Sequence, residues 1–195
     1  TSDPYPVLDS THSIVYINGA SYTNTKPKHT FDEDGFCTEP GCSYYQPAVE
    51  VNGVYQIYNN GQLLWFAAFV NNDAAHAQYE TSDPSADAML MNDLALNHTI
   101  DDEATWVPIG NRDISYCGTF DGKTISNLVT NGEKYQGFVG HLGDGGVIQN
   151  LTLDATCSVK PGTSYGNNYV GGICGRQSGG TIQNCANYAE VSGRN

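Results

Sequence analysis

Two cysteines separated by four residues, Cys37 and Cys42, follow an acidic run near the start of the chain. Thiols at this spacing can form a local disulfide or contribute to a tetrahedral zinc site. A zinc site would use His29 as a third ligand, but the sequence offers no obvious fourth ligand. The acidic run at 32–35 lacks the further oxygen ligands of an EF-hand loop and is read as a solvated turn. We therefore favour a disulfide between the two cysteines and expect no metal site and no cofactor.

The residues that could support catalysis do not form a recognisable catalytic pattern. The zinc-protease motif His-Glu-x-x-His is missing from the sequence. The letters Gly-x-Ser-x-Gly occur once, at 162–166, in a loop-like segment and not at the strand-to-helix turn that a nucleophile needs. Cleavage of a glycosidic bond would need two carboxylates that face one groove. Asp121, Asp144 and Asp154 fall near predicted turns and do not recur at one repeated position, so we interpret them as turn residues. The sequence thus predicts no catalytic residue and a protein that is not an enzyme.

Four other residues are candidates for covalent modification. Sequons for N-linked glycosylation begin at Asn97, in a loop-like segment, and at Asn150, which also occupies a repeated structural position. Cys174 and Cys185 are predicted to point inward. They could bond to each other, Cys185 could bond to Cys157 instead, or the thiols could remain free.

The composition indicates an extracellular, β-rich protein. Charged residues make up 15 % of the chain, while 22 glycines and 13 tyrosines favour short strands and tight turns over helices. The net charge of −13 argues against binding to nucleic acid, because such binding needs Lys and Arg to neutralise phosphates. No apolar run is long enough for membrane insertion. The even number of cysteines favours secretion, and the first four residues look like a mature N-terminus.

A six-residue pattern occurs three times in the C-terminal half of the chain. Each copy reads small or polar, β-branched, Ile, polar, Asn, apolar or Cys, and the copies lie at 123–128, 146–151 and 180–185. The block Gly-Phe-Val-Gly at 137–140 also matches Gly-Ile-Cys-Gly at 172–175. The copies are unequally spaced, and residues 161–168 have the composition of a loop inserted between two of them. Such a repeat is typical of a solenoid, so residues 117–193 are predicted to form about three parallel β-coils.

Stacked coils would place equivalent residues of the three copies above one another, about 4.8 Å apart. The predicted interior stacks are Ile125 with Ile148 and Ile182, and Leu128 with Leu151 and Cys185. Each Asn between the two apolar positions breaks the strand alternation, and asparagine tolerates the left-handed conformation of a sharp corner. The predicted corner residues are Asn127, Asn150 and Asn184.

The region before the repeat is predicted to cover the first coil. Residues 60–72 include an apolar run bounded by Asn59 or Asn60 as N-cap and by Asn71 at its end, which favours a buried helix. The predicted fold is therefore all-β, a short parallel β-helix with an N-terminal capping helix and a small β/loop appendage. Its three predicted parts are the extension and Cys-linked loop at 1–52, the cap and irregular first coil at 53–116, and the repeat coils at 117–195.

Several segments resemble the GLUG-motif repeat family. The similar segments lie at 55–66, 106–110 and 118–128, and the blocks at 137–140 and 172–175 look like the motif itself. The resemblance covers about residues 31–193. Family members often carry Cys-x-x-Cys-Gly in the loop at 31–47, whereas this chain has four residues between its cysteines. The family consists mostly of large secreted or surface proteins, so the resemblance implies a β-helix-like repeat, a surface, adhesive or scaffolding role, and no shared catalytic residues.

These features predict an extracellular structural or adhesive β-helix module of a cell-surface protein. No capping helix is predicted near residues 192–195, so the last coil is expected to be open to further repeats or to another copy of the chain. Copies stacked head to tail would build a filament. The alternative is a carbohydrate-binding or carbohydrate-cleaving β-helix domain with surface glycans as partners. The tyrosines that could stack on sugars are Tyr44, Tyr45, Tyr135, Tyr165 and Tyr169.

Overall fold

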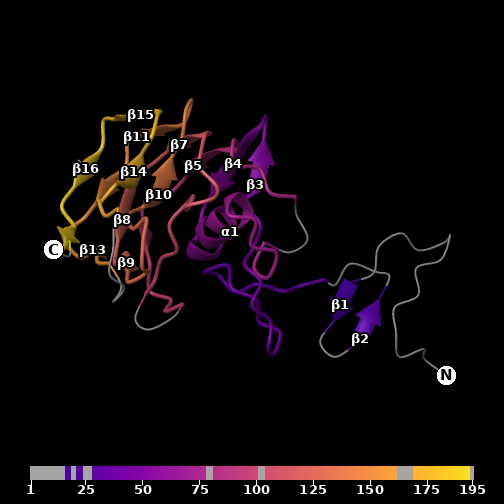
Figure 1. Ribbon diagram of the computed structural model, residues 1–195. Helices are drawn as coiled ribbons and strands as arrows, with labels where there is room; N and C mark the ends of the chain where they lie inside the picture. The colour runs from indigo at the N-terminus through magenta and orange to yellow at the C-terminus, as the bar shows by residue number, and fades with distance from the viewer. Residues whose placement is uncertain are drawn as a thin grey trace, which may run out of the picture.

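Short parallel strands stack into a β-solenoid of about four turns, which contains one short helix (Figure 1). The structure is a computed structural model that describes residues 16–18, 21–23, 28–77, 81–100, 104–161 and 169–193. The predicted fold class, an all-β parallel β-helix with an N-terminal helix, is confirmed. Most of the predicted inserted loop at 161–168, including Tyr165, lies outside the described residues.

The largest sheet runs along the whole solenoid and has six strands. In spatial order they are β15 (Thr181–Gln183), β11 (Val147–Gln149), β7 (Thr119–Asp121), β5 (Asp87–Leu90), β4 (Val54–Ile57) and β3 (Val49–Val51). Each step from β4 to β15 is a parallel pairing and corresponds to one turn of the solenoid. Only β3 is antiparallel to its neighbour, with which it forms a hairpin. The predicted boundary between residues 52 and 53 falls in the turn of this hairpin.

The other sheets of the solenoid contain fewer strands, and each strand has two to four residues. One contains β16 (Ala186–Asn187), β12 (Thr152–Leu153), β8 (Thr124–Ser126) and β6 (Leu94–Ala95). Another contains β17 (Glu190–Val191), β13 (Ser158–Val159) and β9 (Val129–Thr130), and a third pairs β10 (Val139–Leu142) with β14 (Cys174–Gln177). A separate antiparallel pair is formed by β1 (Tyr16–Asn18) and β2 (Ser21–Thr23).

Three asparagines adopt the left-handed backbone conformation that the sequence predicts for corners. The φ angles are 58° at Asn127, 57° at Asn150 and 52° at Asn184. A side chain of most other residue types would clash there with the following carbonyl, which explains why asparagine recurs.

The predicted register of the first repeat copy is wrong. Ile148 pairs with Ile182 as expected, but its partner in the preceding coil is Phe120 rather than Ile125. Ile125 instead pairs with Leu153 in the neighbouring sheet. The predicted stacking of Asn127 and Leu128 is wrong for the same reason. These two residues form the corner between β8 and β9, whereas Asn150 and Leu151 form the corner between β11 and β12, which is a different corner of the coil. The same local pattern forms two different corners of the coil. It therefore predicts a sharp corner but does not predict which corner of the coil it forms.

The helix α1 (Asn60–Val70) covers the first coil, as predicted. Of the two candidate N-caps it uses Asn59, whose side-chain oxygen accepts a hydrogen bond from the Gln62 amide at 2.9 Å. All eleven residues of the helix are buried. The ring of Phe66 lies 6.1 Å from those of Tyr116 and Phe120, so the helix packs against the interior side chains of the coils.

The opposite end of the described solenoid is open. Ile148, Leu151 and Val159 in the penultimate coil have no exposed surface. In the last coil the corresponding interior side chains are only partly buried, and they are Ile173, Cys174, Ile182, Cys185 and Ala189. This last coil, drawn in yellow, lies on the far side of the molecule from α1 (Figure 1).

Candidate functional site

The loop at 28–47 begins with a tight acidic turn that reverses the chain direction. Phe31 and Cys37 form an antiparallel bridge. Inside it, the side chain of Asp32 accepts a hydrogen bond from the Phe36 amide at 2.8 Å, and Gly35 takes a φ angle of 86°. The Asp32 carboxylate thus forms a hydrogen bond within the turn, and all three acidic residues of the run are exposed.

A second turn follows directly and brings the two cysteines together. The Cys42 amide donates to the Glu39 carbonyl at 3.0 Å, and Gly41 has a φ angle of 75°. The Cys37 amide then donates to the carbonyl of Tyr44 at 3.3 Å. Because the chain reverses twice, Cys37 and Cys42 approach the residues that precede the first turn.

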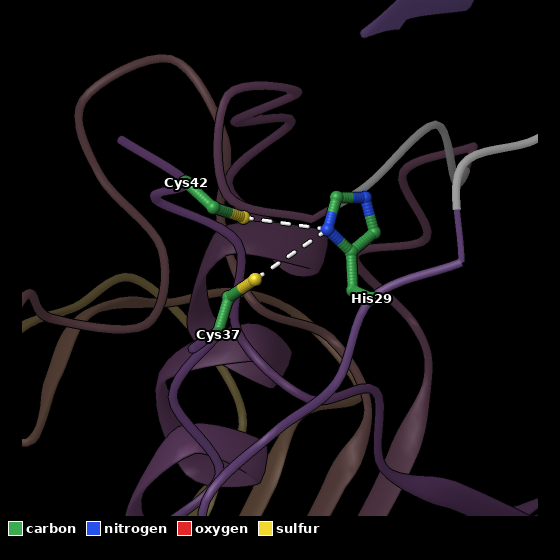
Figure 2. A group of neighbouring side chains, drawn as sticks. All are labelled: His29, Cys37 and Cys42. Atoms are coloured by element: carbon green, nitrogen blue, oxygen red, sulfur yellow. Dashed lines mark hydrogen bonds between the residues drawn. The ribbon is translucent and has the colours of Figure 1, made fainter. Parts of the chain in front are cut away.

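The two sulfur atoms converge on one histidine nitrogen (Figure 2). His29 Nδ1 lies 3.4 Å from the Sγ atom of Cys37 and 3.4 Å from that of Cys42. The three ligand atoms all lie within 4.8 Å of one another, and the three residues are half-buried. The predicted disulfide is not formed, because both cysteines are free thiols that face the imidazole. We call these residues the His29 cluster.

The surroundings of the His29 cluster favour the protonated form of one of its thiols. Burial raises the pKa of Cys42 to about 11, and the neighbouring Cys37 adds to this rise. The Tyr44 amide opposes it by donating a hydrogen bond of 3.5 Å to the Cys42 sulfur. Such an amide is already positioned to stabilise a thiolate once a cation neutralises its charge.

A cleft of about 300 Å³ adjoins the His29 cluster. Both cysteines line it, together with aromatic residues and two further histidines, His76 and His98. His76 stacks on Tyr45 with ring centroids 5.0 Å apart, and its Nδ1 lies 2.6 Å from an Asp73 carboxylate oxygen. His98 stacks on Phe36 at 3.9 Å. Burial raises the pKa of Tyr45 to about 12, so its phenol stays neutral at physiological pH.

The loop is anchored to the N-terminal end of the capping helix. The Gly61 amide donates to the Asp34 carbonyl at 2.7 Å, and the Gln46 amide donates to the Gly35 carbonyl at 2.9 Å. The backbones of Gly35 and Gly61 approach so closely that a Cβ atom on Gly61 would overlap the Gly35 carbonyl. The His29 cluster therefore sits on a segment that is fixed to the solenoid.

Of the alternatives left open for Cys174, Cys185 and Cys157, the structure shows free thiols. Cys174 and Cys185 are free thiols, and their sulfurs donate to the carbonyls of Arg176 at 3.0 Å and Gln183 at 3.2 Å. Burial raises the pKa of Cys174 to about 11. Cys157, the other suggested partner, is a buried free thiol.

Two of the three candidate carboxylates, Asp121 and Asp154, accept hydrogen bonds from neighbouring coils. The two oxygens of Asp121 accept hydrogen bonds from Gln149 at 3.0 Å and Asn150 at 2.8 Å. Asp154 accepts a hydrogen bond of 2.6 Å from Ser126. These contacts agree with a structural role for both carboxylates.

The two sequon asparagines are both exposed but differ in their hydrogen bonds. A glycan would attach to the side-chain nitrogen of asparagine. In Asn150 this nitrogen donates to Asp121 at 2.8 Å, whereas the recorded contact of Asn97 uses its oxygen, which accepts from Asn127 at 2.8 Å. The nitrogen that would carry a glycan is thus engaged at Asn150 and is not the atom that Asn97 uses to contact Asn127.

Most of the candidate sugar-stacking tyrosines pack against other side chains. The Tyr44 ring contacts His29 edge to face at 4.8 Å, and Tyr45 stacks on His76. Tyr135 is buried and lies 5.0 Å from Tyr169, which also contacts the Arg176 guanidinium at 5.2 Å.

Comparisons with known proteins agree with the family resemblance. Residues 166–192 match the family described as the GLUG motif, which confirms the resemblance predicted from the sequence. Over 147 residues the chain is 35 % identical to halomucin of Haloquadratum walsbyi (strain DSM 16790 / HBSQ001). The match covers 70 % of this chain and 1 % of halomucin, so the chain spans only a small part of that relative. No solved structure gives a significant match.

The matches and the fold together suggest a β-helix module of a surface protein. Among the described residues, no helix has the length and apolar character needed to cross a bilayer.

Proposed function

We propose that this GLUG-motif chain is a structural and adhesive β-helix module of an extracellular surface protein, without enzymatic activity, whose last coil joins further β-coils. The single observation that carries this proposal is the open end of the solenoid. Interior side chains there are half-buried, whereas the side chains at the equivalent positions one coil earlier are fully buried. Each strand of the last coil also has a parallel partner on one side only.

Such an end favours the addition of another coil. Unpaired strand edges are templates for pairing, and partly exposed apolar side chains gain free energy when they are covered, roughly 25 cal/mol per Å². A coil added at this end would provide both kinds of contact in the geometry that already repeats along the solenoid.

A row of polar side chains on the outer face also favours the addition of a coil at the open end. Gln183 donates to Gln149 at 2.9 Å, and Gln149 donates to Asp121 at 3.0 Å, so one ladder of hydrogen bonds crosses three coils. Gln183 ends the ladder in the described structure. A further coil with a side-chain amide at this position would extend the ladder by one step.

Two sources could supply the next coil. Further repeats of the same polypeptide are the first, and the match to 1 % of halomucin supports them, because a relative of that length has room for many coils. A second copy of the chain is the other source and would produce a filament. The net charge of −13 means that copies repel one another, and salt screens this repulsion. Self-association is therefore expected to strengthen as the ionic strength rises.

The assembly of the purified chain tests the proposal. Light scattering after size exclusion, with negative-stain microscopy, is expected to show head-to-tail oligomers that grow with protein and salt concentration. Ile182→Lys should reduce this association, because it places a charge in the half-buried stack. Thr181→Lys is the matched control, since it adds the same charge to an exposed side chain of the same strand. A strict monomer that cleaves or binds surface glycans would favour the carbohydrate alternative and contradict the structural role.

A further inference from the structure

We propose that His29, Cys37 and Cys42 bind a zinc ion that fastens the loop at 28–47 onto the helical end of the solenoid. This site is separate from the open coil on which the proposed function rests. It lies in the part of the chain that does not repeat, and its two cysteines and one histidine are residue types that commonly bind zinc.

The distances in the His29 cluster already fit a tetrahedral site. Zinc lies about 2.3 Å from a sulfur ligand and about 2.0 Å from a nitrogen ligand, so two ligand atoms on a tetrahedron are about 3.5 Å apart for N and S and about 3.8 Å apart for two sulfurs. His29 Nδ1 is 3.4 Å from both sulfurs, and the two sulfurs are no more than 4.8 Å apart. An ion would therefore need only small side-chain movements to bind.

Hydrogen bonds alone do not explain this convergence well. A neutral imidazole nitrogen that accepts hydrogen bonds has one lone pair in the plane of the ring. Two thiols that point at this nitrogen compete for that lone pair, so at most one of them can make a good S–H···N bond. A zinc ion placed among the three atoms would satisfy both sulfurs and the nitrogen together.

The backbone around the cysteines has the features of a preformed metal loop. The Tyr44 amide donates to the Cys42 sulfur, which is the kind of outer contact that orients a thiolate ligand. The two turns hold Cys37 and Cys42 on the same side of the loop, with hydrogen bonds between Cys37 and Tyr44 and between Cys42 and Glu39. The ligands are thus placed by backbone structure and do not depend on long flexible side chains.

The ligand types select the ion. Two thiolates and one imidazole form a soft donor set that suits zinc and disfavours calcium or magnesium, which take oxygen ligands. Two thiolates would neutralise the charge of Zn²⁺, and the chain's net charge of −13 would raise the local concentration of cations.

The fourth coordination position would face the adjoining cleft. Both cysteines line this cleft of about 300 Å³, and three protein ligands leave one tetrahedral position for water or for a small molecule. His76 and His98 line the same cleft and could interact with a molecule bound there.

Zinc would connect the two sides of the acidic turn within the loop at 28–47. His29 lies before the acidic turn, and the cysteines lie after it on a loop bonded to the helix through Gly61. The same loop contacts the turn after the helix, where the Tyr45 amide donates to the His76 carbonyl at 3.3 Å. A bound ion is therefore expected to stabilise the closed end of the solenoid and to raise its melting temperature.

The experiment uses the full chain, purified under reducing conditions and freed of metal with a chelator. Titration with Zn²⁺ against a chromophoric competitor is expected to give one ion per chain and a higher melting temperature. Co²⁺ in place of Zn²⁺ is expected to give thiolate-to-metal charge-transfer bands in the near ultraviolet, together with the intense visible bands of a tetrahedral site. The cobalt spectrum reports ligand identity directly and does not depend on stability.

Ligand variants complete the test. His29→Ala, Cys37→Ser and Cys42→Ser should each weaken zinc binding by at least about 100-fold and abolish or alter the cobalt spectrum. Cys117→Ser is the matched control, because it removes a half-buried free thiol outside the cluster and should leave both readouts unchanged. Two results would overturn the proposal: a reduced wild-type chain that binds no zinc, or a Cys37–Cys42 disulfide found by mass spectrometry in the chain isolated without reductant.

Discussion

The two ends of this solenoid differ in how completely they bury an interior isoleucine. Ile57 in the first coil is completely buried beside the capping helix, whereas Ile182 in the last coil is only half-buried. Both side chains point into the interior, so the difference lies in what covers them. The first coil is closed by α1, whose residues are buried on every side, and the last coil is followed by nothing comparable in the described structure. Closure of a solenoid thus comes from a segment that breaks the repeat.

The two parts of the molecule also differ in what their polar side chains do. In the coils, the polar side chains Asp121, Gln149 and Asp154 bond to neighbouring coils. At the helical end, the non-repeating loop gathers two thiols and one imidazole nitrogen within reach of a single ion. Repetition favours side chains that satisfy one another from coil to coil, while the irregular end is free to build a local site.

The largest expected effect compares the two isoleucines directly. Ile57→Ala should lower the free energy of unfolding by about 2–5 kcal/mol, because it leaves a cavity under the helix. Ile182→Ala should cost roughly 1 kcal/mol, because its side chain is already partly in water. Urea denaturation of both variants measures the difference at a protein concentration at which the wild type is monomeric. Equal costs would mean that Ile182 is covered in solution, and the contrast between the ends would disappear.

Much of this architecture could be predicted from the sequence because it depends on local patterns. The buried helix follows from an apolar run that begins after Asn59, and the corners follow from asparagines that tolerate a left-handed φ angle. The register could not be predicted in the same way. Ile125 and Ile148 occupy similar local patterns at different corners, and only the length of the intervening chain decides which residues stack.

The candidate site shows a different limit. The spacing of Cys37 and Cys42 indicates that they lie close together, and the sequence offers His29 as a possible third ligand. Whether the thiols bond to each other or face a third group depends on the two turns between them. Those turns are set by backbone hydrogen bonds, such as that from the Cys37 amide to the Tyr44 carbonyl, which residue spacing does not specify.

A smaller effect is expected at the corners, and here the two ends should behave alike. Asn150→Ala and Asn184→Ala should each cost about 1–2 kcal/mol, because alanine is strained at the observed φ angles of 57° and 52°. Glycine at either position should remove this strain. The backbone part of this cost is the difference between the alanine and the glycine variant at one position, and it does not depend on whether another coil covers that position. Both substitutions at Asn150 also remove its hydrogen bond to Asp121, which this difference cancels. Thermal denaturation of the four variants provides the measurement, and an alanine-to-glycine difference found only at Asn150 would show that burial decides the cost.

The smallest expected effect concerns a carboxylate that links two covered coils. A hydrogen bond from Ser126 is the largest cause that lowers the pKa of Asp154, and Thr156 adds to it. A pKa lower in the folded than in the unfolded chain means that the ionised form stabilises the fold. This contribution is fully present above the ordinary pKa of about 3.9 and is lost as the pH falls through the folded value.

Carbon-13 titration of the side-chain carboxyl groups measures the pKa of Asp154, and denaturation at several pH values measures its contribution to stability. Ser126→Ala should raise the pKa of Asp154 toward its ordinary value, and it should flatten the dependence of stability on pH below about pH 4. Asn187 pairs with Leu153, so the position equivalent to Asp154 in the last coil is the exposed Tyr188, which has no carboxylate. If Ser126→Ala left the titration of Asp154 unchanged, the hydrogen bond between the coils would not persist in solution, and one of the polar contacts that distinguish the covered coils from the open one would be lost.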